Sequence, residues 1–252
     1  MYTAKKTSNG APTKGGAVTS SKGRVRATAT PAKVPQHLQS RAEQYAAGKS
    51  LRATCPRSAH GDWKAASDRR DAVEIVLAAG KGRLPELLPL RHGRMVRSAF
   101  TFYRGSALAM AADLGPTPAS GIRVQCCGDA HLCNFGGFAT PERRVIFSIN
   151  DLDETLPAPW EWDVKRLAAS FVVGCRDNGL SDATAKDVVK VCVRTYRESM
   201  AEFSQMKTLD LWYYAHGQDE MMATIKDPKL RQRALDRIKK ETGKSRGEEI
   251  LG

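Results

Sequence analysis

The chain has 252 residues, of which 41% are hydrophobic, and it carries a formal net charge of +13 at pH 7. This length and composition predict a globular protein with one good core or two small ones. No apolar run approaches the ~20 residues that a membrane-spanning helix needs. Residues 1–33 contain no apolar segment that would serve as a signal-peptide core. We therefore expect a cytoplasmic protein with no membrane partner and with its six cysteines reduced.

The positive charge is concentrated at the two ends of the chain. Residues 1–35 contain seven Lys or Arg and no acid, and residues 226–246 contain nine against three acids. Residues 36–225 are nearly balanced, with 24 bases and 22 acids. Because nucleic-acid recognition needs its charge on a folded face, we expect no specific nucleic-acid partner. The composition of residues 1–35 lacks apolar side chains to bury, which predicts a disordered basic tail.

The first half of the folded region has helical periodicity. We expect helices over residues 36–48 and 63–79, with Gly80 ending the second one. The sequence AGKGR at 79–83 lacks the G-x-x-x-x-G-K-[ST] phosphate-loop pattern, so it indicates a helix end. A third helix is expected over 91–112, with Arg91, Arg94 and Arg97 on one face.

Two alternating runs follow, and both lead into acidic residues. Residues 122–127 alternate apolar and polar side chains and stop at Gly128, and residues 145–149 repeat the alternation after a turn at 140–143. We expect these two strands to form a β-hairpin. The first strand then opens into Asp129 and Asn134, and the second into Asp151, Asp153 and Glu154.

The last third of the chain is again helical. Helices are predicted over 160–176 and, capped by Ser181, over the next residues, where Val188, Val193 and Met200 belong to an inward stripe. Within 206–216 we interpret Trp212, Tyr213 and Tyr214 as helix-packing residues. The break at 227–228 precedes a basic helix over 229–241. Few strands among many helical stripes predict an α+β fold that is mostly helical.

The central acids have a spacing that suits phosphoryl transfer. Asp129 and Asn134 form D-x-x-x-x-N, in which the carboxylate meets the acceptor hydroxyl and the amide oxygen meets Mg²⁺. Asp151 follows the next strand and completes the metal site, because Mg²⁺ prefers a few oxygen ligands together with phosphates and water. Arginine suits bidentate phosphate recognition, so Arg97 and Arg104 are candidate phosphate or substrate contacts.

A transition-metal site is an alternative for the same loop. Cys127, His131 and Cys133 are ligand types that zinc favours, but their spacing lacks a second cluster and a fourth ligand. We therefore rank this alternative below the magnesium site.

Three long motifs carry a family resemblance. RHGRMVRSAFTFYRGSA, GDAHLCNFG and INDLDETLPAPWEWDVKRLAAS closely resemble the bacterial family called domain of unknown function 2252, over roughly residues 51–214. The same motifs are similar, more remotely, to the aminoglycoside phosphotransferase branch of the protein-kinase-like fold. That branch has the pattern H-G-D-x-x-x-x-N, then a strand ending in I-D.

The resemblance implies a kinase-like C-lobe whose small β-hairpin carries the catalytic loop. Asp129 then matches the catalytic Asp, Asn134 and Asp151 match the metal ligands, and Asp163 matches the Asp that braces the loop. Two departures are present: Cys127 replaces the His of the pattern, and the interval from Asn134 to Asp151 is longer than usual. Asp153 is therefore a rival metal ligand. His131, inside the loop motif, is a further candidate substrate contact.

The resulting expectation is a phosphotransferase that uses Mg²⁺ with ATP or another nucleoside triphosphate. Its partners are a nucleotide and a small-molecule or protein hydroxyl acceptor. The sequence has no glycine-rich strand pair followed by a lysine-bearing strand, whereas the resembled family continues into such a segment. We therefore expect residues 36–225 to form the kinase-like domain and residues 226–252 to begin a truncated continuation. A non-catalytic module that binds a nucleotide, a metal or a partner is the alternative.

Overall fold

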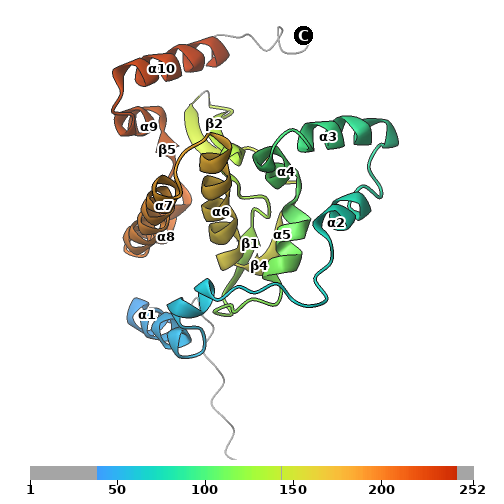
Figure 1. Ribbon diagram of the computed structural model, residues 1–252. Coiled ribbons are helices and arrows are strands. Elements are labelled where there is room, and N and C mark those ends of the chain that lie inside the picture. The colour runs from blue at the N-terminus through green and yellow to red at the C-terminus, as the bar shows by residue number, and fades with distance from the viewer. Residues whose placement is uncertain (1–38, 143, 243–252) are drawn as a thin grey trace, which may run out of the picture. The chain divides into compact units, whose positions relative to one another are not determined.

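The computed structural model describes residues 39–142 and 144–242, and the chain divides into two compact units, 1–45 and 46–252. The described part of the first unit is residues 39–45, where helix α1 (Arg41–Ser50) begins. The predicted basic tail lies outside the described residues. The described chain is α+β and mainly helical, with two small antiparallel sheets (Figure 1). None of its helices is long and apolar enough to cross a membrane.

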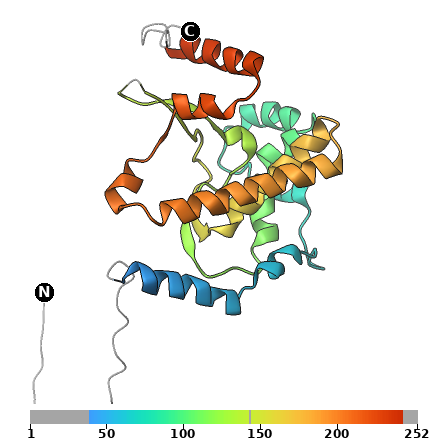
Figure 2. The same ribbon diagram turned by 90° about the vertical axis from the view of Figure 1, so that its left-hand side faces the viewer.

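A helical hairpin forms the centre of the second unit. Helix α6 (Glu161–Asp177) turns through a left-handed Gly179 into α7 (Asp182–Phe203), and the two helices pack along each other (Figures 1 and 2). The Ser181 side chain accepts the Thr184 N–H and so caps α7. Both helices and this cap confirm the sequence prediction.

The inward stripe predicted for α7 is only partly covered. Val193 and Met200 are 42% and 49% exposed, and Ala185 is the buried residue of this helix. The helix has 22 residues against 17 in α6, so its C-terminal end extends past its partner. The prediction that these two side chains lie in the core is therefore wrong.

The helices before the sheets are shorter than their periodicity predicts. Helix α2 is Ala72–Ala78, because Asp71 accepts the N–H groups of Val73 and Glu74 and starts the helix there. The predicted start at residue 63 is wrong. Short 3₁₀ turns, η2 (Leu51–Ala53), η3 (Arg57–Gly61) and η4 (Pro85–Leu87), connect the helices of this region.

The predicted helix over 91–112 is three helices, α3 (Leu88–Met95), α4 (Ala99–Gly105) and α5 (Ala107–Leu114). Ser98 and Thr101 form a reciprocal capping box that starts α4, which the periodicity did not indicate. Arg97 therefore lies between α3 and α4. The prediction that it shares a helix face with Arg91 and Arg94 is wrong.

The strands pair differently from the predicted hairpin. Strand β1 (Arg123–Cys126) pairs with β4 (Leu156–Pro159), whereas β3 (Val145–Ile149) forms a hairpin with β2 (Phe135–Ala139). A two-residue strand, β5 (His216–Gly217), adds to β3. The sequences FGGFA and LPAP give no alternating pattern, because glycine and proline replace the apolar residues of a typical strand.

The C-terminal helices of the described chain follow β3 and β5. Helix α9 (Gln218–Thr224) contacts both strands, and α10 (Pro228–Thr242) contacts α9. Between α7 and β5, α8 (Thr208–Trp212) leaves Trp212 and Tyr213 80% exposed. These two side chains were predicted to pack, and that prediction is wrong. Tyr214 does pack, with its ring edge on Phe203 at 4.9 Å between centroids.

Candidate functional site

The loop that follows β1 is fixed by a carboxylate from the first turn of α6. Asp163 accepts the backbone N–H of Cys127 at 2.7 Å and that of Gly128 at 3.1 Å. Gly128 has φ +81°, and a Cβ at this position would overlap the carbonyl of Glu154. Only glycine satisfies both conditions. The loop therefore leaves β1 in a single conformation that presents Asp129.

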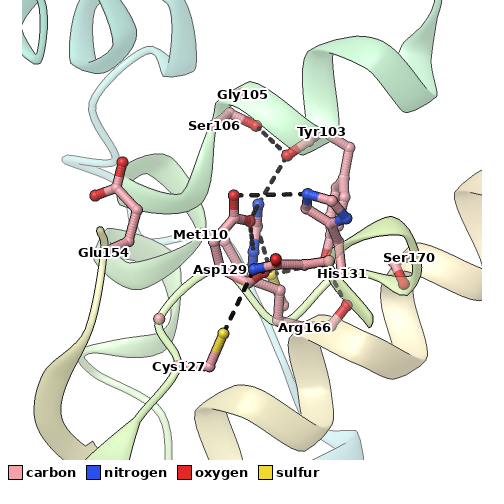
Figure 3. A network of polar contacts seen from close by, with 12 residues as sticks. Tyr103, Gly105, Ser106, Met110, Cys127, Asp129, His131, Glu154, Arg166 and Ser170 are labelled. Carbon is pink, nitrogen blue, oxygen red and sulfur yellow. Dashed lines mark hydrogen bonds and ion pairs between the residues drawn. The ribbon is translucent and has the colours of Figure 1, made fainter. Parts of the chain in front are cut away.

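A buried guanidinium holds the carboxylate of Asp129. Arg166, on α6, donates from Nε at 2.8 Å and from Nη2 at 2.5 Å to Asp129 Oδ1 (Figure 3). The Arg166 side chain is 3% exposed and the Asp129 side chain 18%. A buried charge of this kind requires an opposite charge, so the pair fixes the Asp129 carboxylate in direction.

Helix α4 provides the other side of the Arg166 environment. Arg166 Nη2 donates to the carbonyl of Tyr103 at 2.8 Å, and its guanidinium carbon lies 4.5 Å from the centre of the Tyr103 ring. The Tyr103 hydroxyl donates in return to the Arg166 carbonyl at 2.7 Å. Burial, which outweighs the attraction of the guanidinium, raises the pKa of Tyr103 to about 12. Tyr103 thus remains a neutral donor across the physiological range.

His131 lies on the opposite side of the Asp129 carboxylate. Its Nδ1 accepts the N–H of Cys133 at 3.1 Å, and its Nε2 lies 3.6 Å from Asp129 Oδ2. Burial lowers the pKa of His131 despite the nearby carboxylate. Because Nδ1 accepts a hydrogen bond, the neutral ring carries its proton on Nε2, toward Asp129. His131 therefore orients the carboxylate and does not act as a base in this state.

Asn134 connects the two acidic segments. Its Nδ2 donates to the carbonyl of Asp129 at 3.0 Å and to that of Asp151 at 2.9 Å. Since both acceptors are carbonyls, they fix which amide atom is nitrogen. Within residues 39–142 and 144–242, no hydrogen bond uses Asn134 Oδ1, which leaves this oxygen for a ligand.

The acids after β3 form a turn at the surface. Asp151 Oδ1 accepts the N–H of Asp153 at 3.1 Å, and both residues are exposed. Glu154 accepts from Arg83 at 3.3 Å. Asp151 Oδ1 therefore stabilises the turn, and this hydrogen bond also fixes the orientation of Asp151 Oδ2.

Part of this site lines a cleft of about 700 Å³. The residues from the two acidic segments that line it are Asp129, His131, Asp151, Asp153 and Glu154. The segment from the turn after α2 to α4 adds Arg83, Arg91, Arg94 and Arg104, and Arg83 pairs with Glu154. A cleft lined by both carboxylates and guanidinium groups suits an anionic ligand carried with a cation.

The donor set of the cleft fits Mg²⁺ in chemistry. Asp151 and Asp153 line the cleft and offer carboxylates, and the buried Asn134 behind them offers an amide oxygen; all three are hard oxygen ligands. The described residues contain no group of three or more His, Cys, Asp or Glu placed to hold a metal. A magnesium ion here therefore depends on phosphate and water for its remaining ligands.

The structure brings together most of the predicted site residues. Asp129, Asn134 and Asp151 are linked through hydrogen bonds, and Arg104 and His131 line the same cleft. Arg97 is not among the residues that line it. The zinc alternative has no support in the described chain, because Cys127 Sγ accepts from Asn134 and His131 Nδ1 accepts a backbone N–H.

The sequence analysis missed Arg166, which forms the ion pair with Asp129. A signal was present in the sequence, because Arg166 follows Asp163 by three residues and so shares its face of α6. Because Asp163 points at the loop after β1, Arg166, one turn later on the same face of α6, is expected to lie beside that loop as well. Tyr103 had no such signal, since its contact depends on how α4 packs against α6.

The fold and the site together define an α+β protein with a cleft lined by carboxylates. One of these carboxylates, that of Asp129, is paired with a buried arginine. A family of uncharacterised proteins conserved in bacteria, DUF2252, matches residues 83–251. The chain belongs to this family. No curated protein and no solved structure matches the chain.

Proposed function

We propose that the protein is a phosphotransferase that transfers a phosphoryl group from a Mg²⁺-bound nucleoside triphosphate to a hydroxyl acceptor. The observation that carries the proposal is the double link made by the buried Asn134, which joins the Asp129 loop to the Asp151 turn beside the arginine-containing cleft that Asp129 and Asp151 line. The sequence pattern around Asp129 and Asn134, which resembles the catalytic loop of kinase-like phosphotransferases, supports the proposal.

Each residue has a distinct task in this reaction. Asp129 accepts a hydrogen bond from the acceptor hydroxyl through Oδ2, which it shares with the more distant His131 Nε2, since Arg166 already donates twice to Oδ1. Asn134 and Asp151, with Asp153 as the rival, hold the cation. Magnesium, when bound, neutralises charge on the phosphates. Asp163 braces the loop, and Arg91, Arg94 and Arg104 contact phosphate oxygens.

The transfer itself exchanges one phosphorus–oxygen bond for another. The acceptor oxygen bonds to the γ-phosphorus as the bond to the β–γ bridging oxygen breaks, and the nucleoside diphosphate leaves with that electron pair. The hydroxyl proton passes to Asp129 or to water. Positioning is the main contribution of the protein, because this chemistry needs little covalent help.

The test is a γ-phosphate transfer assay with ATP, Mg²⁺ and a panel of sugar, aminoglycoside and peptide hydroxyl acceptors. We expect transfer by the parent protein and a loss of transfer, with retained nucleotide binding, in Asp129→Asn. Absence of Mg²⁺-dependent nucleotide binding in the parent would refute the proposal.

A second candidate is a module that binds Mg²⁺-nucleotide without turnover. The Asp129–Arg166 pair favours it, because a buried ion pair of this kind also serves a purely structural role in holding the loop. The sequence also lacks a recognisable glycine-rich loop and lysine. Tight nucleotide binding without product for any acceptor would select this candidate over the enzyme.

A further inference from the structure

A second cavity, of about 500 Å³, lies apart from the acidic residues of the cleft. It is bounded by the segment around η3, by α4 and α5, and by α6. Its walls are mainly apolar, with Trp63, Phe102, Met110, Leu114 and Val173 among them. The volume is in the range of about 300–1,000 Å³ that small-molecule sites occupy.

One edge of this cavity is closed by polar contacts of its own. Arg69 binds both carboxylate oxygens of Asp113, at 2.6 and 2.8 Å, and the Trp63 indole donates to the Asp113 carbonyl at 3.4 Å. Arg69 and Asp113 therefore satisfy each other. They define the shape of the cavity and leave its recognition chemistry to other side chains.

Lys165 is the unsatisfied cation of the cavity. Its ammonium makes one long hydrogen bond, 3.4 Å to Thr117 Oγ1, and among the described residues it has no ion pair. Burial lowers the pKa of Lys165, and this effect exceeds the attraction of Glu161 and Cys55. Glu161 attracts this half-buried ammonium without forming an ion pair with it, so an anion that enters beside Lys165 adds a closer opposite charge.

His60 adds a second unsatisfied polar atom to the same cavity. Its Nε2 lies 3.6 Å from the Cys55 thiol, while its Nδ1 is buried with no hydrogen-bond partner in the described chain. Buried polar atoms of native proteins are nearly always paired. A cation without an ion pair and a ring nitrogen without a partner therefore line one mainly apolar cavity, whose lining also includes Asp62 and the Arg69-paired Asp113.

We propose that this cavity is a binding site for a small hydrophobic monocarboxylate, with its carboxylate on Lys165 and its apolar body against Trp63 and Phe102. The carboxylate supplies the ion-pair partner that Lys165 lacks, and His60 Nδ1 pairs with a polar atom of the ligand or with water held by it. The site is separate from the phosphotransferase proposal and does not depend on it.

The test compares two ligands that differ only in charge. We would titrate the full chain with 4-phenylbutyrate and with its neutral amide, 4-phenylbutyramide, and follow binding by isothermal calorimetry and saturation-transfer NMR. We expect the acid to bind at least about tenfold more tightly than the amide, because the ion pair forms in a desolvated site. Octanoate serves as an aliphatic probe of the same class.

Variants separate recognition from folding. Lys165→Met should reduce the affinity for the acid to that of the amide, and Lys165→Arg should restore most of it. Ala109→Phe, at a buried wall position, should fill the cavity and abolish binding of both ligands. Lys186→Met, on the exposed face of α7, is the matched control and should bind like the parent. Circular dichroism verifies that each variant is folded.

Three outcomes would overturn the proposal. These are no binding of either carboxylate at millimolar concentration, equal affinities for the acid and the amide, and an unchanged affinity in folded Lys165→Met. An independent readout is the NMR titration of the Lys165 side chain. Its pKa should rise when 4-phenylbutyrate is bound, and an unmoved pKa would also count against the proposal.

Discussion

Replacing Asp163 with alanine tests how the catalytic loop is held. The substitution removes the acceptor of two backbone N–H groups, those of Cys127 and Gly128, in a region where Cys127 is buried. Each abandoned donor costs about 1–3 kcal/mol. Gly128 is only half-buried and its bond is the longer one, so we expect a total loss of about 2–4 kcal/mol. For a chain of this size the melting temperature should then fall by about 5–15 °C.

The assay is urea unfolding followed by tryptophan fluorescence and circular dichroism. Asp163→Asn keeps one acceptor oxygen, so it should lose about half as much stability as Asp163→Ala. The matched control is Asp182→Ala, which removes an exposed first-turn aspartate of α7 and its solvent-screened surface ion pair with Arg176, so its loss of stability should be much the smaller. Equal losses in Asp163→Ala and Asp182→Ala, or a change below about 0.5 kcal/mol in Asp163→Ala, would refute the reasoning.

Three further substitutions test the surroundings of Asp129. Gly128→Ala should destabilise the protein by about 3 kcal/mol or more, measured by urea unfolding, because its Cβ meets the Glu154 carbonyl at a positive φ; a loss below about 1 kcal/mol would contradict this close approach. Arg166→Met should cost about 2–4 kcal/mol by leaving Asp129 unpaired, and Asp129→Asn in the same chain should recover part of that loss in a double-mutant cycle; strictly additive losses would contradict the pair. The pKa of Tyr103 is raised from 10 to about 12, so its contribution of about 2–3 kcal/mol is complete below pH 10 and is lost as the pH rises through 12. An absorbance titration should therefore show one late tyrosine that is missing in Tyr103→Phe; identical titrations would contradict the burial of this hydroxyl.

Local signals were sufficient to predict the helices of the second half. The stripe of α6 and the Ser181 cap are contained in short stretches of sequence, so both appeared at the expected places. The same applies to the D-x-x-x-x-N spacing, because Asp129 and Asn134 belong to one loop. Their link to Asp151 was also expected, since each acidic segment directly follows a strand.

The pairing of the strands could not be predicted from the sequence, because it depends on non-local contacts. Strand β4 has two prolines in four residues and β2 has two adjacent glycines, so neither gives the pattern of a strand. Tertiary contacts stabilise these segments as strands despite their composition. As a result β1 pairs with β4, and β3 pairs with β2. The Arg166 pairing with Asp129 was missed for a related reason, as it requires knowing which face of α6 the loop meets.

The burial of apolar residues at the ends of α7 and α8 was also predicted incorrectly. Met200 and Trp212 are apolar residues in helical patterns, and such patterns usually indicate burial. A pattern identifies the apolar face of a helix but does not establish that another element covers it. In the described chain both side chains are largely exposed.

The most direct test of the proposed site is an electron paramagnetic resonance titration with Mn²⁺ and ATP, because Mn²⁺ accepts the same oxygen ligands as Mg²⁺. The account predicts that the parent binds Mn²⁺-ATP, that Asp151→Asn or its rival Asp153→Asn binds at least about tenfold more weakly, and that Asp129→Asn stays within about twofold of the parent. Binding like that of the parent in all three variants, or no binding in the parent, would contradict it.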